Sequence, residues 1–146
     1  MKIFFELLAV LASGLFTGGA LFVHFVNHPA IIELGPARGQ PFFAAMYKRA
    51  AILQPLLAIL SFCGGAAAWW AGGGAWWLVP GILMVSLVPY TVLLMLPLNQ
   101  ELTEPGLENN PNRAVELLER WENLHKYRSL IALAAFVIFL LLLGRG

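Results

Sequence analysis

Four apolar stretches, separated by turn-forming or polar segments, constrain this chain more than any other feature of its sequence. We predict one helix in each stretch, over about residues 3–27, 42–70, 76–98 and 112–143. Each is long enough to cross a bilayer, which takes about 20 apolar residues. Charged residues make up 12% of the chain and apolar residues 60%, whereas about a quarter of a soluble domain is charged. The sequence therefore predicts an all-α integral membrane four-helix bundle in the lipid bilayer, with residues 1–146 as a single domain.

Charge and cysteine content exclude other classes of protein. The net charge is +1 and the chain has no basic run, so nothing favours nucleic-acid binding. The only cysteine, Cys63, lies inside an apolar stretch, which excludes an intramolecular disulfide and a thiolate metal cluster. Candidate functional residues are therefore sought among the histidines and the polar residues near the helix ends.

The first predicted helix has one small and polar face, which carries two histidines. At 100° per residue, His24 and His28 share an arc with Glu6, Ser13, Gly14, Thr17 and Gly18. Large apolar side chains, Phe16 among them, lie on the opposite arc. Helices in a bilayer turn small and polar residues toward other helices, so the histidine arc is expected to face the bundle. Gly14 and Gly18 form a GxxxG pair, which allows close approach of another helix, within the bundle or in a homo-oligomer.

Prolines and glycines indicate where the predicted helices end. Pro29 ends the first helix, and the link over residues 29–41 holds three prolines, so it is predicted to be irregular. A glycine turn over residues 72–74 separates two tryptophan pairs, which are read as anchors at the membrane surface. The polar segment over residues 101–112 is predicted to be a solvent loop. The fourth helix begins as an amphipathic helix, so its N-terminal part is expected to extend into solvent.

The other three helices also carry polar residues that are expected to face the interior. In the second, Tyr47, Gln54 and Ser61 recur every seven residues among alanines. In the third, three prolines predict kinks that leave a cavity, with Tyr90 near the middle and Asn99 at the exit. In the fourth, one face carries Trp121, His125 and Arg128, and the opposite face, which includes Glu122 and Lys126, is expected to be solvated.

These polar residues are expected to meet at one end of the bundle, because successive helices alternate in direction. All three histidines, His24, His28 and His125, are therefore predicted to share a single dry pocket near that end. Seven of the nine lysines and arginines lie toward the same end. By the positive-inside rule this end is expected in the cytoplasm, and the chain is expected in the cell inner membrane.

Four short patterns follow one another along the chain. They are His24-Phe25-Val26-Asn27-His28-Pro29, Phe43…Tyr47-x-Arg49…Gln54-Pro55, Pro97-x-Asn99, and Trp121-x-x-x-His125-x-x-Arg128. As a set they resemble the anthrone oxygenase-like family of small membrane proteins, formerly a domain of unknown function. The resemblance implies a cofactor-independent monooxygenase of the kind that converts anthrones to anthraquinones.

An oxygenase of this kind gives each candidate residue a role. A neutral His28 or His125 would remove an acidic C–H proton from a small lipophilic aromatic substrate. Arg128 or Arg49 would stabilise the resulting anion, which O₂ would then capture. Asn27 and Asn99 would act as neutral donors, and the predicted substrate-binding residues are Trp121, Tyr47, Arg49, Gln54, Asn99 and Tyr90.

Two other functions stay open. His24, His28 and His125 would provide the ligands of a transition metal or a haem, since histidines four apart with a distant third are a recognised metal-binding pattern. Alternatively, the chain is a non-enzymatic transport or assembly protein. No internal repeat of the kind found in transporters is present in the sequence.

Overall fold

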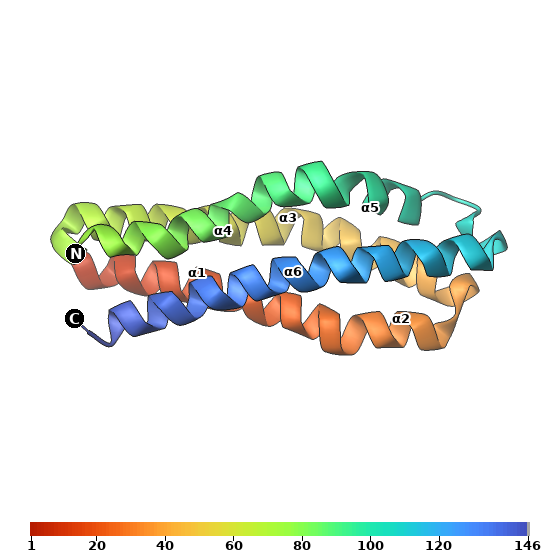
Figure 1. Ribbon diagram of the computed structural model, residues 1–146, viewed down its shortest axis with the longest axis horizontal. Helices are drawn as coiled ribbons and strands as arrows, with labels where there is room; N and C mark the ends of the chain where they lie inside the picture. Colours follow the sequence, from red (N-terminus) through yellow and green to blue (C-terminus); the bar gives the residue numbers. More distant parts are fainter. Residues whose placement is uncertain (146) are drawn as a thin grey trace.

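The computed structural model describes residues 1–145 and is a bundle of four long helical segments (Figure 1). The segments are Lys2–Leu34, Pro36–Gly73, Ala75–Leu102 and Pro111–Leu143, and each is long and apolar enough to cross a membrane. The predicted all-α four-helix bundle with four spans is therefore confirmed. The exposed surface is rich in large apolar side chains, such as Leu11, Ile52 and Leu93, as expected where helices face lipid.

Short π-helical segments interrupt the first and the third of the four long segments, and another ends the second. The first contains α1 (Lys2–Phe22), the π-helical η1 (Val23–Asn27) and α2 (His28–Leu34); the second contains α3 (Pro36–Ala68) and η2 (Trp69–Gly73). The third contains η3 (Ala75–Trp77), α4 (Leu78–Tyr90), the π-helical η4 (Thr91–Met95) and α5 (Leu96–Leu102). After η5 (Leu107–Asn109), the chain ends with α6 (Pro111–Leu143).

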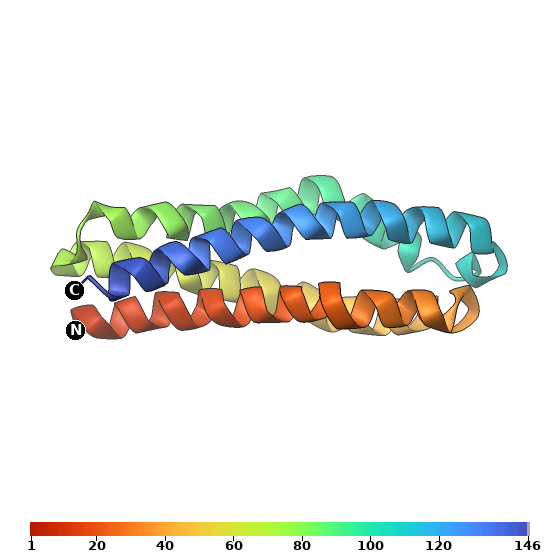
Figure 2. The same cartoon turned by 60° about the horizontal axis from the view of Figure 1, so that its bottom comes forward.

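The helices form a ring in which α1 packs against α3 and α6, and α4 packs against the same two helices. Both termini lie at one end of the bundle, together with the turn between α3 and α4 (Figure 2). The other end carries the turn between α2 and α3 and the loop before α6. The bundle thus has a terminal end and a loop end, as the alternation of helix directions predicted.

The prediction of an irregular link over residues 29–41 is wrong. The first segment stays helical through Pro29 to Leu34, and α3 already begins at Pro36 instead of near residue 42. Only Gly35 turns the chain, with a φ of 71°, a conformation that glycine adopts at little cost. Pro29 and Pro36 each lie in the first turn of a helix, where no hydrogen bond from the proline nitrogen is needed.

Two of the π-helical segments end shortly before a proline. η1 ends two residues before Pro29, and η4 ends two residues before Pro97. A π-helical turn takes up one additional residue and so shifts the pairing of the backbone groups. The helix can therefore continue past a residue without an N–H group. The three prolines of the third span were predicted to kink it; the α-helix continues through Pro80 and Pro89 and is interrupted only at η4, two residues before Pro97.

The core consists of two separate clusters of buried apolar residues. The terminal-end cluster includes Phe16, Leu87 and Phe139, and the loop-end cluster includes Phe43 and Trp121. Phe16 is 1% exposed, so its predicted position toward lipid is wrong. Trp77 is also buried and packs on Phe139, whereas Trp69, Trp70 and Trp76 are exposed, as expected of anchors.

Gly64 allows α3 to pack closely against α1. A Cβ atom at this position would lie 2.7 Å from the backbone nitrogen of Ala9. We expect Gly64→Ala to lower the free energy of unfolding by about 1–3 kcal/mol, the usual cost of overpacking. Thermal unfolding in detergent measures this. Gly18→Ala is the matched control, because a Cβ at Gly18 meets nothing within 4 Å; an equal loss in both variants would contradict the prediction.

Candidate active site

A cavity of about 190 Å³ lies where the two core clusters meet. All four long segments contribute to its wall, so it is enclosed only in the assembled bundle. Most of the wall is apolar. The lining residues with polar side chains are Tyr47, Gln54, Thr91, Asn99, Trp121, His125 and Arg128. A cavity with an apolar wall and a few converging polar groups is the usual form of a small-molecule site.

His125 is the buried imidazole in this wall. Its Nε2 lies 3.0 Å from the carbonyl oxygen of Ala20, and a carbonyl only accepts hydrogen bonds. Nε2 therefore carries the proton, and in the neutral ring Nδ1 keeps its lone pair. Nδ1 is buried and has no hydrogen-bond partner in residues 1–145. This arrangement presents a free basic nitrogen in an apolar environment.

Arg128 supplies a cation to the same cavity. Its Nη1 donates to Thr91 Oγ1 at 3.3 Å, and its guanidinium carbon lies 5.4 Å from the centre of the Phe16 ring. Nε of Arg128 is buried and makes no hydrogen bond within the described residues. No acidic side chain lines the cavity, so the guanidinium is available to an anionic ligand.

Gln54 adds a neutral acceptor to the cavity. Its side-chain oxygen is buried and unpaired within residues 1–145. A Cβ on Gly19 would come within 2.9 Å of its amide nitrogen, so the glycine makes room for this side chain. The cavity thus combines a base, a cation and an acceptor, each with unused hydrogen-bonding capacity. Buried polar groups are rarely left unpaired in proteins, which indicates a polar ligand for this site.

Trp121 closes the loop-end side of the cavity. Its indole nitrogen donates to Asn99 Oδ1 at 2.7 Å. Its ring lies between two imidazoles, stacked on His125 with centroids 4.5 Å apart and on His28 with centroids 6.0 Å apart. Phe43 packs edge-on against it, at 5.2 Å. These contacts hold the His125 ring in one plane.

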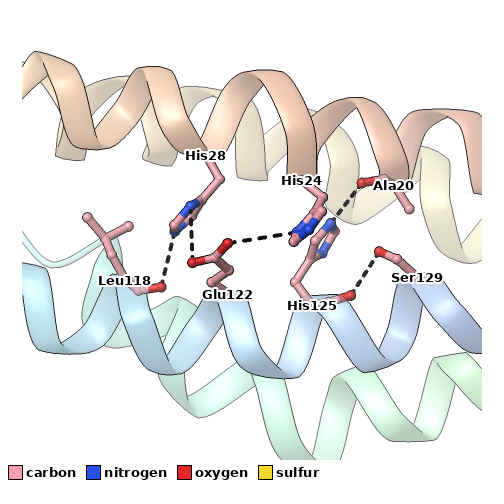
Figure 3. A network of polar contacts seen from close by, with 7 residues as sticks. All are labelled: Ala20, His24, His28, Leu118, Glu122, His125 and Ser129. Carbon is pink, nitrogen blue, oxygen red and sulfur yellow. Dashed lines mark hydrogen bonds and ion pairs between the residues drawn. The ribbon is translucent and has the colours of Figure 1, made fainter.

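His24 and His28 lie close to His125 (Figure 3) but do not line the cavity. His28 Nε2 lies 3.3 Å from the Leu118 carbonyl oxygen, which makes it the donor. Nδ1 of His28 and Nδ1 of His24 face the carboxylate of Glu122, at 3.6 and 3.9 Å. The expectation that all three histidines share one pocket is therefore wrong, because only His125 lines the cavity and the other two face Glu122.

Three more of the predicted site residues lie outside the cavity wall. Asn27 donates to the sulfur of Met46 at 3.2 Å. Tyr90 donates to the Leu124 carbonyl at 3.0 Å. Arg49 is exposed and donates to the carbonyl of Ala45, one turn earlier in its own helix. Tyr47, Gln54, Asn99, Trp121, His125 and Arg128 do come together.

The sequence did not predict two contacts: that of Glu122 with His24 and His28, and that of Thr91 with Arg128. Glu122 was expected on a solvated face with Lys126, but it faces His24 in η1 and His28 in α2. An acidic residue one turn before His125, on a helix that packs beside a histidine pair, was the available signal. In residues 1–145 no three histidine, cysteine or carboxylate side chains are placed to hold a metal ion.

The fold and the cavity define a class: a four-helix protein of membrane type, with a base and a cation in an apolar site. The chain belongs to the anthrone oxygenase family, whose model matches residues 43–138. An anthrone oxygenase of Claviceps purpurea (strain 20.1) is 30% identical over 143 residues, covering 88% of this chain and 82% of that protein. No solved structure matches the chain. His125 and Arg128 lie within the matched range, whereas His24 and His28 lie before it.

Proposed function

We propose that this protein is a membrane oxygenase that oxidises a small lipophilic aromatic ketone of the anthrone type with O₂, without a cofactor. Membership of the anthrone oxygenase family supports an oxygenase-like function. The observation that carries the proposal is the unpaired Nδ1 of His125, a residue that lines the apolar cavity together with Arg128.

In the first step, His125 Nδ1 takes a proton from the methylene carbon that is conjugated with the substrate carbonyl. The electron pair moves onto the carbonyl oxygen and forms an enolate. Arg128 faces this negative charge, and its attraction is strong because the cavity wall is apolar. His28 was an alternative base, but its Nδ1 faces Glu122 and its Nε2 the Leu118 carbonyl, so we assign proton abstraction to His125.

In the second step, the enolate carbon transfers one electron to O₂ and combines with the superoxide that forms. The peroxide anion takes the proton held by His125 and becomes a hydroperoxide. Loss of the second C–H proton to His125, with cleavage of the O–O bond, releases water and leaves the second carbonyl of the quinone. One O₂ is consumed for each quinone and each water formed, so no outside reductant is needed.

The direct test uses the purified protein in lipid nanodiscs with a panel of anthrones. Quinone formation and O₂ uptake are followed together, and heat-denatured protein measures spontaneous oxidation. The proposal requires a saturable, protein-dependent rate with equal amounts of O₂ consumed and quinone formed. A rate equal to that of denatured protein for every anthrone would reject it.

The same preparation tests the histidine-ligated metal or haem alternative. We expect elemental analysis to find no stoichiometric transition metal, and quinone formation to survive dialysis against a chelator, because the proposed chemistry uses only side chains and O₂. A stoichiometric metal that is lost in the His125→Ala variant would instead favour the alternative.

We also propose that the loop end faces the cytoplasm. Six lysines and arginines outside the cavity belong to that end and two to the terminal end, which is the bias of the positive-inside rule. Proteolysis of the segment between α5 and α6 in sealed inner-membrane vesicles of known orientation would test the assignment.

A further inference from the structure

The cavity beside His125 is closed toward the loop end of the bundle. Trp121 and Asn99 are 5% and 2% exposed and are hydrogen-bonded to each other. Behind them lies the loop-end cluster, in which Phe43 is fully buried. A compound that comes from water at this end would have to displace tightly packed aromatic and aliphatic side chains.

The cavity is open on one side, between α3 and η4. Among its lining residues, Ala51 on α3 and Val92 on η4 are the exposed ones, and the others are buried or partly buried. The ribbon between α4 and α5 rises away from α3 in this region (Figure 1). Both rim residues are apolar, and Ala51 is small.

The rim lies at the depth of the lipid hydrocarbon. Val92 follows the anchor Trp76 by 16 residues and Ala51 precedes the anchor Trp69 by 18, which places them about 24 and 27 Å from the terminal end at 1.5 Å per residue. The hydrocarbon layer is about 30 Å thick. The exposed Arg49 lies just beyond Ala51, as expected of a residue at the boundary with the headgroups.

We propose that the substrate reaches His125 sideways from the lipid layer, through the gap between Ala51 and Val92. This inference rests on the proposed function for the identity of the compound, a lipophilic aromatic ketone, which dissolves in the bilayer and is scarce in water. The route matches the chemistry of the site, because a path that never opens to water protects the enolate from protonation and keeps the cavity dry.

Thiol labelling tests the route without any turnover. Met95→Cys places a reporter thiol in the cavity wall, and Cys63→Ser removes the exposed native thiol. In liposomes, we expect an uncharged aryl maleimide to label the reporter at least about 50-fold faster than a sulfonated maleimide, because the sulfonate is costly to transfer into hydrocarbon. Ala58→Cys, in the α3 wall of the same cavity, is a second reporter.

The decisive comparison is between a variant in which the gap between Ala51 and Val92 is narrowed and a control variant in which it is not. Ala51→Trp should slow labelling by the uncharged reagent about tenfold, because access then requires a side chain to move. Ile52→Trp is the control, since Ile52 is 75% exposed and does not line the cavity. Equal labelling by both reagents, no labelling of either reporter, or no difference between the two tryptophan variants would overturn the route.

The same variants separate this inference from the proposed function. If the protein oxidises anthrones, Ala51→Trp should lower kcat/KM about tenfold and leave kcat nearly unchanged, because the change slows access and not chemistry. If no anthrone is oxidised while the labelling pattern holds, the proposed function fails and the lateral route stands for another lipophilic compound.

Discussion

Replacing His125 by glutamine should reduce kcat by about 100- to 10,000-fold, the usual contribution of a positioned general base. Glutamine can still donate a hydrogen bond to the Ala20 carbonyl, which His125 Nε2 contacts at 3.0 Å. What it lacks is the basic nitrogen that occupies the Nδ1 position. The expected result is therefore a loss of turnover with little change in thermal stability or in binding of the quinone product.

The matched controls are His24→Gln and His28→Gln. Both side chains face Glu122 and neither lines the cavity, so kcat should fall much less than in His125→Gln. His28 stacks on Trp121, and a modest loss in that variant would reflect a shift of the indole. A loss of kcat in His28→Gln as large as in His125→Gln would transfer the role of base to His28.

Replacing Arg128 by methionine should have the second largest effect, a loss of about 100- to 1,000-fold in kcat, which is typical for the removal of a group that stabilises a developing oxyanion. The methionine is long enough to keep contact with Phe16, over which the guanidinium now lies. The charge and the hydrogen bond to Thr91 are lost.

Ligand binding gives an independent measure of the same role. Arg128→Met should weaken binding of an anionic polycyclic phenolate far more than binding of the neutral quinone, since only the anion gains from the guanidinium. Arg49→Met is the matched control, because Arg49 is exposed and bonds to its own helix. Equal weakening of both ligands by Arg128→Met would mean that the arginine only supports the packing.

The bundle and its spans could be predicted from the sequence because lipid imposes a strong rule: long apolar stretches must be helical and must cross. The positions of His125, Arg128, Gln54 and Trp121 followed from helical periodicity. These four residues lie on α3 and α6, which no π-helical segment interrupts, so that a 100° rotation per residue applies along each helix.

The wrong predictions concern residues in or next to a π-helical segment, where the rotation per residue differs from 100°. His24 and Asn27 lie within η1 and His28 follows it directly, so their directions could not be counted from the α-helical residues before them. The tertiary pairing of Glu122 with two histidines of another helix is also invisible to periodicity, because it depends on which helices are neighbours. Proline was a poor guide as well: Pro29 lies in a first helical turn, where it is tolerated.

Each of the two interrupted spans consists of one α-helix before the π-helical segment and one after it, and the two are rotated relative to each other about the helix axis. Each wider turn rotates the part after it by up to about 100° relative to a continuous α-helix. Deleting one residue inside η1 would restore a straight helix and carry His28 away from Glu122. Within each interrupted span, separate stretches of sequence therefore decide which side chains face the bundle before and after the π-helical segment.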